Sequence, residues 1–162
     1  GLEVDYEQVL EVEVSGNKNL KVRVGGTVDR IDQIGDRIRV VDYKTGKADV
    51  NVKSIESLFI DKANRNKAAF QTMLYAGCVV QTLKPVEPVL PAVYGARGVF
   101  KDDFDPLFTI NNSPLIYQAN ASEYVDFLKQ MLAEIIDSTV AFVQTTDDKK
   151  CSYCSFNGIC RR

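Results

Sequence analysis

The sequence predicts an α/β fold in which a mixed central sheet starts as an antiparallel meander and is flanked by helices. Three strand-like segments come first, a long helical segment follows, and a run rich in strand-forming residues lies beyond that helix. We expect this later strand to join the same sheet. At 162 residues the chain is long enough for one hydrophobic core, so we expect a single domain over residues 1–162.

The first three strands are expected at residues 9–14, 20–34 and 37–43. A polar turn at residues 15–19 separates the first two. Between the second and third, Gly35 and Asp36 form a two-residue hairpin loop. A short helix is expected at residues 54–60.

A longer helix is expected over residues 66–83, where Lys84-Pro85 ends it. Its apolar stripe consists of Phe70, Met73, Leu74, Gly77 and Cys78. The later strand covers residues 89–96, and residues 108–110 form a further short strand.

The last helix is expected to start at Asn120, which acts as N-cap with Glu123 as its capping-box partner. We expect it to end near Gln144, where a polar linker leads to the cysteines. Its core stripe is Tyr124, Phe127, Leu128, Met131, Leu132, Ile135, Ile136 and Val140.

The Gly35-Asp36 loop fixes the register of the hairpin between the second and third strands. Counting back from the loop places Ile31 opposite Val40, and Asp29 opposite Asp42. Directly opposed residues have Cβ atoms about 4.5–5.5 Å apart, and like charges so placed destabilise a sheet. A bound divalent cation would explain such a pair.

Lys44 lies on the same face of the strand as Asp42, because side chains alternate along a strand. The rest of that face is apolar, so it should look toward the core. Two acids and a lysine at the end of an apolar face indicate a hydrolytic metal site. The alternative is a structural network in which Lys44 and Arg30 neutralise Asp29 and Asp42.

Three cysteines, Cys151, Cys154 and Cys160, follow a C-x2-C-x5-C pattern at the end of the sequence. Such close spacing lets several sulfurs converge on one metal centre. Free thiols or a disulfide are the alternatives. Cys78 lies on a helical apolar stripe, which favours a core cysteine over a fourth ligand. The chain contains no histidine, so no histidine can complete a zinc site.

The overall charge does not indicate a nucleic-acid partner, because 20 basic residues face 22 acidic ones. A local excess of basic residues could line a phosphate path, although a solvated face is the simpler interpretation. No apolar run is long enough to span a membrane. We expect a cytoplasmic protein. The basic residues concerned are Lys44, Lys47, Lys53, Lys62, Arg65 and Lys67.

Four motifs in order give the sequence its closest resemblance to a known family. They are G-x-x-D-R-I-D at residues 26–32, D-Y-K-T-G at 42–46, Q-x-x-x-Y at 71–75 and the cysteine pattern at 151–160. Together they resemble the RecB-type branch of the PD-(D/E)XK nuclease superfamily, and especially the iron–sulfur nuclease domain of AddB-type helicase–nuclease subunits. The resemblance implies a restriction-endonuclease-like core and a chain that is the C-terminal part of a larger protein.

The resemblance also assigns roles to residues. Asp29 and Asp42 match the two metal-binding acids, with the carbonyl of Tyr43 as a further oxygen for Mg²⁺ or Mn²⁺. Lys44 matches the catalytic lysine. Gln71 and Tyr75, four residues apart on one helical face, match the helix motif that supports the site and meets the nucleic acid. Cys151, Cys154 and Cys160 match three of the four ligands of a 4Fe–4S cluster.

The function implied is metal-dependent hydrolysis of DNA, single-stranded or at duplex ends, beside a helicase domain or partner subunit. Two family features are missing: the upstream fourth cysteine and a histidine before the first strand, for which Glu3, Asp5 and Glu7 are the nearest substitutes. The chain by itself could therefore be weakly active or inactive. The alternatives are a non-catalytic scaffold that binds DNA or a helicase, and an iron–sulfur redox or sensing module.

Overall fold

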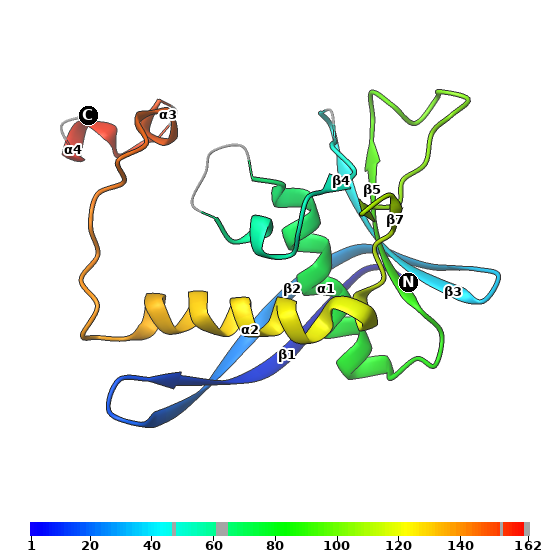
Figure 1. Ribbon diagram of the computed structural model, residues 1–162. Helices are drawn as coiled ribbons and strands as arrows, with labels where there is room; N and C mark the ends of the chain where they lie inside the picture. Colours follow the sequence, from blue (N-terminus) through cyan, green and yellow to red (C-terminus); the bar gives the residue numbers. More distant parts are fainter. Residues whose placement is uncertain (47, 61–64, 153, 161–162) are drawn as a thin grey trace.

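A four-stranded mixed sheet forms the centre of the molecule (Figure 1). The computed structural model describes residues 1–46, 48–60, 65–152 and 154–160. The strand order is β1-β2-β3-β5, in which β1 to β3 are antiparallel neighbours and β5 runs parallel to β3. This confirms the predicted mixed sheet. The strands are β1 (Leu2–Val14), β2 (Lys18–Ile34), β3 (Arg37–Lys44) and β5 (Val89–Gly95).

A smaller sheet and a single helical turn connect these elements. The smaller sheet contains β4 (Asn51–Val52), β6 (Thr109–Ile110) and β7 (Ser113–Pro114). The strand expected at residues 108–110 is confirmed as β6. The short helix expected at residues 54–60 is reduced to one 3₁₀ turn, η1 (Glu56–Leu58).

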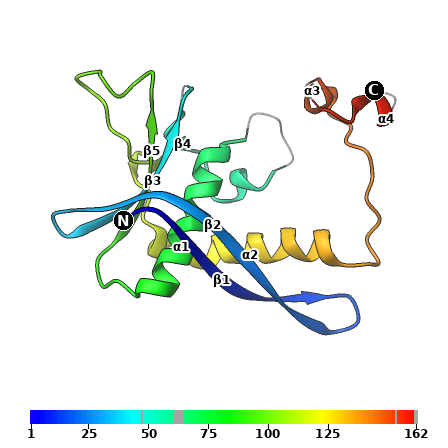
Figure 2. The ribbon, with the colours of Figure 1, turned by 180° about the vertical axis from the view of Figure 1, so that it is seen from behind.

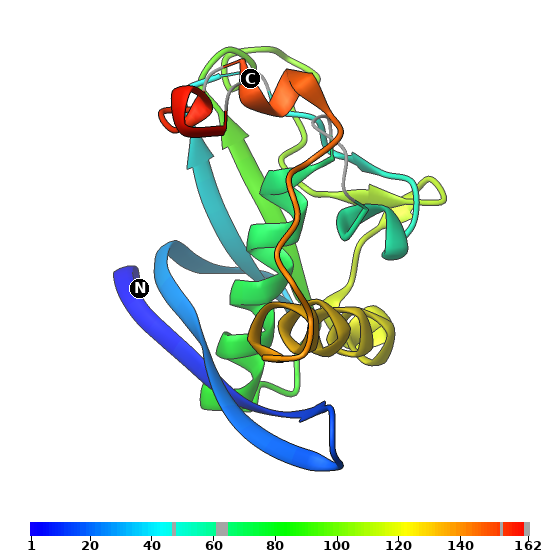
Figure 3. The same cartoon turned by 90° about the vertical axis from the view of Figure 1, so that its left-hand side faces the viewer.

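Two long helices, α1 (Lys67–Leu83) and α2 (Tyr117–Ile136), lie on the same side of the main sheet, as the edge-on view shows (Figure 3). The side chain of Asn66 caps α1 by accepting the N–H of Ala69. At the other end Lys84 adopts a left-handed conformation with φ 49°, which stops the helix.

The hydrophobic core lies between the sheet and the two helices. Because α1 is covered on more than one side, its buried face is wider than the predicted stripe. Ala69, Thr72 and Ala76 are fully buried, whereas Phe70 and Leu74 are only half-buried. The largest fully buried side chains are Tyr124, Phe108, Ile55, Leu58 and Met73.

The first strand begins at Leu2, seven residues before the predicted start at residue 9. Its added part pairs with β2, from Leu2 opposite Arg30 to Gln8 opposite Val24. This part of the strand was not predicted because acids occupy every second position, Glu3, Asp5 and Glu7, where they form its exposed face.

The predicted limits of α2 are wrong at both ends. The helix starts at Tyr117, whose side chain is only 5% exposed, and burial of this ring extends the helix by almost one turn. Asn120 therefore lies inside the helix and donates to the carbonyl of Ile116 instead of capping. No side chain caps α2, so Glu123 has no capping-box partner.

The helix also ends earlier than predicted, at Ile136. Asp137 is extended, and its carboxylate accepts the backbone N–H of Ser15 at 2.9 Å and that of Thr139 at 2.9 Å. These hydrogen bonds keep the pKa of Asp137 well below the usual value. As a result Ile135 and Val140, predicted as core residues, are 51% and 43% exposed.

The C-terminal residues lie away from the core (Figures 1 and 2). An extended segment leads from α2 to two short helices, α3 (Asp148–Cys151) and α4 (Asn157–Cys160). Lys47 and Lys62 of the basic run lie outside the described residues. Among the described helices, none combines the length and apolar character needed to cross a bilayer.

Candidate active site

The hairpin of β2 and β3 sets the positions of the two predicted acids. Ile34 faces Arg37, and Ile31 faces Val40, which confirms the predicted register. The positive φ of Gly35, 59°, suits the first position of a type II′ turn. The regular ladder stops at Arg30 opposite Val41, one step before the predicted Asp29–Asp42 pair, and Asp29 is close enough for its charge to act on Asp42.

The carboxylate of Asp29 turns toward the neighbouring strand. Its Oδ2 accepts the backbone N–H of Tyr43 at 2.8 Å. Burial raises the pKa of Asp42, and the negative charge of Asp29 makes a smaller contribution in the same direction.

Asp42 is 3% exposed, and burial is the main reason why its pKa is raised. The ammonium of Lys44 opposes this effect, since its Nζ lies 2.9 Å from Oδ1 and 2.7 Å from Oδ2 of Asp42. Oδ2 makes no hydrogen bond of favourable geometry within the described part of the chain, although the ammonium lies only 2.7 Å away. A cation bound at Asp42 would therefore share this buried carboxylate with Lys44.

A hydrogen-bonded chain runs from the sheet to α1. Lys44 Nζ donates to Oε1 of Gln71 at 3.1 Å, and Nε2 of Gln71 donates to the hydroxyl of Tyr75 at 2.9 Å. The structure therefore connects Asp42, Lys44, Gln71 and Tyr75, which the sequence predicted as site residues. One turn of α1 separates Gln71, which contacts Lys44 at the carboxyl end of β3, from Tyr75, which lies beside Gly26 of β2.

Gly26 belongs to the same group, although no role was predicted for it. A Cβ atom at Gly26 would lie 3.1 Å from the hydroxyl oxygen of Tyr75 and 3.2 Å from its Cε1. Such contacts are tight, so glycine makes room for this ring. The available signal was the glycine three residues before Asp29 in the G-x-x-D motif.

Asp29, Asp42 and the carbonyl of Tyr43 were the predicted metal ligands. Their oxygens are the donor type that Mg²⁺ and Mn²⁺ prefer. The described residues contain no group of three or more His, Cys, Asp or Glu side chains arranged to hold a metal ion. Two carboxylates and a carbonyl would leave other positions of a cation to water and phosphate, as Mg²⁺ commonly keeps.

The acids of β1 do not supply a third carboxylate. Asp5 accepts the hydroxyl of Thr27 at 2.6 Å, and Glu7 forms an exposed ion pair with Arg23 at 3.6 Å. The ladder between β1 and β2 pairs Leu2 with Arg30 and Val4 with Val28 but skips Glu3, whose side chain is exposed and whose φ is 49°.

The other face of the hairpin carries a separate ionic network. Asp32 accepts two hydrogen bonds from Arg39, at 2.7 and 2.8 Å, and pairs with Arg30 at 2.7 Å. No role was predicted for Arg39. Because Arg30 contacts Asp32, the alternative in which it neutralises the Asp29–Asp42 pair is not supported.

The cysteines form no metal-ligand group within the described residues. Cys151 and Cys154 lie in one turn, where the N–H of Cys154 donates to the carbonyl of Cys151 at 3.1 Å. Cys160 ends α4, and all three are free thiols of intermediate exposure. Cys78 is fully buried in α1 near the carbonyl of Val24, and burial raises its pKa to about 11, as expected for a core cysteine.

Comparison with known proteins identifies the class to which this fold and this site belong. The model of the PD-(D/E)XK nuclease superfamily matches residues 2–161, nearly the whole sequence. The chain belongs to this superfamily, whose members are generally nucleases.

No curated protein matches the sequence. One solved structure, described as the crystal structure of SSO0001, is similar over 99% of this chain and 59% of that chain. The identity is 20% and the TM-score 0.40, values too low to carry an argument about function. The chain thus spans 59% of the length of that protein.

Proposed function

We propose that this chain is a metal-dependent DNA nuclease domain of the RecB type, part of a recombination and repair helicase–nuclease. One observation carries the proposal: Asp42 is buried near Asp29, and both of its carboxylate oxygens contact the ammonium of Lys44. Membership of the nuclease superfamily supports it.

Each residue has a chemical role in phosphodiester hydrolysis. Asp29, Asp42 and the carbonyl of Tyr43 would hold the cation. Mg²⁺ or Mn²⁺, when bound, supplies Lewis-acid stabilisation of the phosphate and lowers the pKa of a water. The ammonium of Lys44 donates to a phosphate oxygen or to the attacking water, and so stabilises charge that develops in the transition state.

Gln71 and Tyr75 keep this ammonium in place and extend the polar surface toward the nucleic acid. Because Gln71 accepts from Lys44 and donates to Tyr75, movement of either partner changes where the lysine points. The Tyr75 hydroxyl is then available to a phosphate oxygen.

The test is cleavage of labelled single-stranded DNA with Mg²⁺ or Mn²⁺ by the parent chain, Asp42→Asn and Lys44→Gln. Both variants should lose activity by a factor of about 100 or more, as for the loss of one stabilising donor. Asp36→Asn is the matched control, because Asp36 is an acid in the same hairpin with a 91% exposed side chain. Equal rates in all variants would reject this site.

The cysteine segment supports a second, structural part of the proposal. Cys151, Cys154 and Cys160 are free and closely spaced, which suits a 4Fe–4S cluster whose fourth ligand comes from elsewhere. As they stand, the sulfurs do not form a ligand group. Anaerobically purified protein should show visible absorbance from thiolate-bound iron, and Cys151→Ser should abolish it. Colourless protein without bound iron would show that these three cysteines by themselves do not hold the cluster.

A further inference from the structure

A second polar hollow adjoins the candidate active site at the carboxyl end of β3. It has a volume of about 360 Å³ and lies where the segment after β3 meets the start of α1. Lys44 lines this hollow and also contacts Asp42, so the two sites are continuous. The other lining residues are Thr45, Gly46, Ala48, Asp49, Arg65, Asn66, Lys67 and Ala68.

The charge of the hollow is positive. Its lining includes three basic residues, Lys44, Arg65 and Lys67, and one acid, Asp49. The carboxylate of Asp49 already accepts the N–H of Asn51 at 3.0 Å. Among the described residues neither Arg65 nor Lys67 takes part in an ion pair. The guanidinium of Arg65 lies over the ring of Phe70, 5.4 Å from its centroid, which orients this cation without neutralising it.

The walls of the hollow are fixed by Asn66, which lies between the two cations. Its Oδ1 accepts the N–H of Ala69 at 3.0 Å, and its Nδ2 donates to the carbonyl of Asp49 at 2.7 Å. These bonds hold the segment after β3 against the start of α1. A ligand in the hollow therefore meets a preformed site, which lowers the entropic cost of binding.

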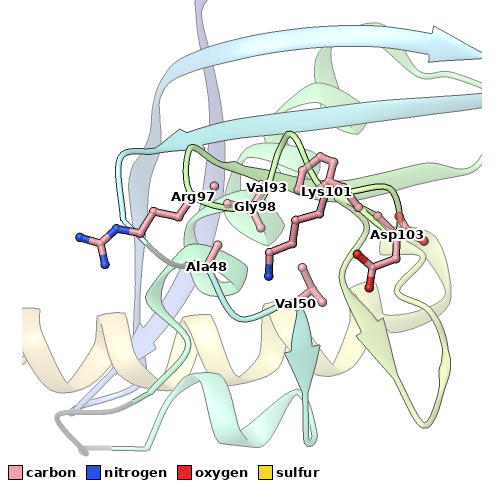
Figure 4. Close-up of a pocket in the computed structure, with 10 residues that line it drawn as sticks. Ala48, Val50, Val93, Arg97, Gly98, Lys101 and Asp103 are labelled. Carbon is pink, nitrogen blue, oxygen red and sulfur yellow. The ribbon is translucent and has the colours of Figure 1, made fainter.

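The neighbouring pocket beyond β5 has a different character (Figure 4). Its volume is about 340 Å³, and Arg97 and Lys101 share its lining with Asp103 and Asp105. Arg97 points away from Lys101 in this view. Equal numbers of acids and bases give no preference for an anion, so this pocket does not continue the positive surface.

We propose that the hollow beside Lys44 binds a phosphate of a nucleic-acid strand, the one that flanks the phosphate at Asp42 and Lys44. Arg65 and Lys67 are its ligands, since guanidinium and ammonium groups are the side chains that pair with phosphate. The two sites then hold neighbouring phosphates and fix the position of the strand. This inference rests on the proposed nuclease function and adds two substrate-positioning residues to it.

The test measures binding of a fluorescein-labelled oligothymidylate by anisotropy, with Ca²⁺ in place of Mg²⁺, over a range of salt concentrations. Arg65→Gln/Lys67→Gln removes both charges from the hollow. We expect roughly tenfold weaker binding at low salt, and a slope of log K against log salt that is shallower by roughly 0.7, the value for one phosphate of a single strand. A purely structural role would not change the slope.

The matched control is Lys18→Gln/Lys21→Gln, which removes two exposed charges from β2, near the turn that follows β1. It should leave affinity and slope unchanged. An equal loss in this control, an unchanged slope in the test variant, or no binding by the parent chain would overturn the inference. If Arg65→Gln disturbs folding, the single variant Lys67→Gln tests the inference instead. Lys67 is exposed, so its replacement should leave the fold intact.

Cleavage, measured separately, distinguishes this inference from the function on which it rests. If the parent chain cuts DNA but the double variant leaves the salt slope unchanged, the nuclease function stands and the phosphate site is rejected. A parent chain that binds with the expected slope change but never cuts DNA keeps the phosphate site and rejects cleavage by this chain on its own.

Discussion

The ammonium nitrogen of Lys44 lies 3.1 Å from Oε1 of Gln71, although one residue belongs to the strand β3 and the other to the helix α1. On its other side the same nitrogen contacts both carboxylate oxygens of Asp42. The lysine is thus held by the sheet and by a helix, and its position depends on how the two pack together.

Gln71→Ala should therefore lower kcat and leave KM almost unchanged. The variant keeps the charges of the site but releases Lys44, so the loss falls on the transition state. A decrease of roughly tenfold, equivalent to about 1.4 kcal/mol, is expected. Steady-state cleavage kinetics measure it, with Gln81→Ala as control, an exposed glutamine of the same helix. A change in KM alone would contradict this role.

Mn²⁺ should stabilise the chain against heat, and Asp42→Asn should abolish the effect. A ligand at 100 times its Kd stabilises by about 2.7 kcal/mol. For a chain of this size that corresponds to several degrees, at about 2–4 °C per kcal/mol. Thermal unfolding with and without Mn²⁺ measures the shift. A shift that persists in Asp42→Asn would show that the metal binds elsewhere.

The same stabilisation should depend on pH in a direction set by Asp42. Burial raises the pKa of Asp42 in the folded chain. In the absence of metal, ionisation of Asp42 therefore lowers the stability of the fold as pH rises through that raised pKa. A cation needs the ionised form, and protons therefore compete with it at a higher pH than at an ordinary carboxyl of pKa about 3.9. The Mn²⁺ shift should weaken on acidification while exposed carboxyls are still ionised.

Local chemistry was enough to predict the hairpin that carries the acids. A Gly-Asp loop and alternating side chains determine the register, and both act over a few residues. The contact of Lys44 with Gln71 spans 27 positions in the sequence. This contact could be predicted only from the family resemblance, because no local sequence signal places α1 against β3.

The errors arose where tertiary contacts override local signals. Asn120 and Glu123 have the capping-box spacing, yet burial of Tyr117 starts α2 earlier. The apolar pattern continues to Val140, yet hydrogen bonds from Ser15 and Thr139 to Asp137 favour an extended backbone there. In both places a buried or distant residue determines where the helix begins or ends, and the local sequence pattern predicts a different residue.

Arg39→Met should destabilise the fold more than Arg37→Met. Arg39 is the main reason why the pKa of Asp32 is lowered, and its side chain is 11% exposed against 54% for Arg37. Because the folded pKa is depressed, this stability is present above the unfolded value of about 3.9 and is lost as pH falls through the lowered pKa.

We expect Arg39→Met to cost about 1–3 kcal/mol near neutral pH, as for loss of hydrogen bonds to a charged group. Urea unfolding at several pH values measures the difference between the two variants. The difference should shrink at strongly acidic pH, where Asp32 is protonated in both states. A gap that is constant with pH would indicate lost packing of the Arg39 stem instead.

Gly26→Ala should reduce cleavage by acting through Tyr75. The new methyl group would lie 3.1 Å from the tyrosine hydroxyl, so the ring must shift and its bond to Gln71 must lengthen. Stability should change by less than about 1 kcal/mol, because the smaller backbone entropy of the unfolded alanine chain offsets the crowding. Gly98→Ala is the control, since its Cβ would make an ordinary contact at 3.6 Å.

A double-mutant cycle tests the route of this effect. In a Tyr75→Phe background the hydroxyl and its hydrogen bond to Gln71 are gone. The contact with ring atom Cε1 at 3.2 Å remains, but a shift of the ring no longer moves a hydrogen-bonding group of the site. The combined variant should therefore cleave DNA almost as well as Tyr75→Phe alone, which is a non-additive result. Additive losses would mean that the methyl group acts on the neighbouring strand and not on the hydroxyl.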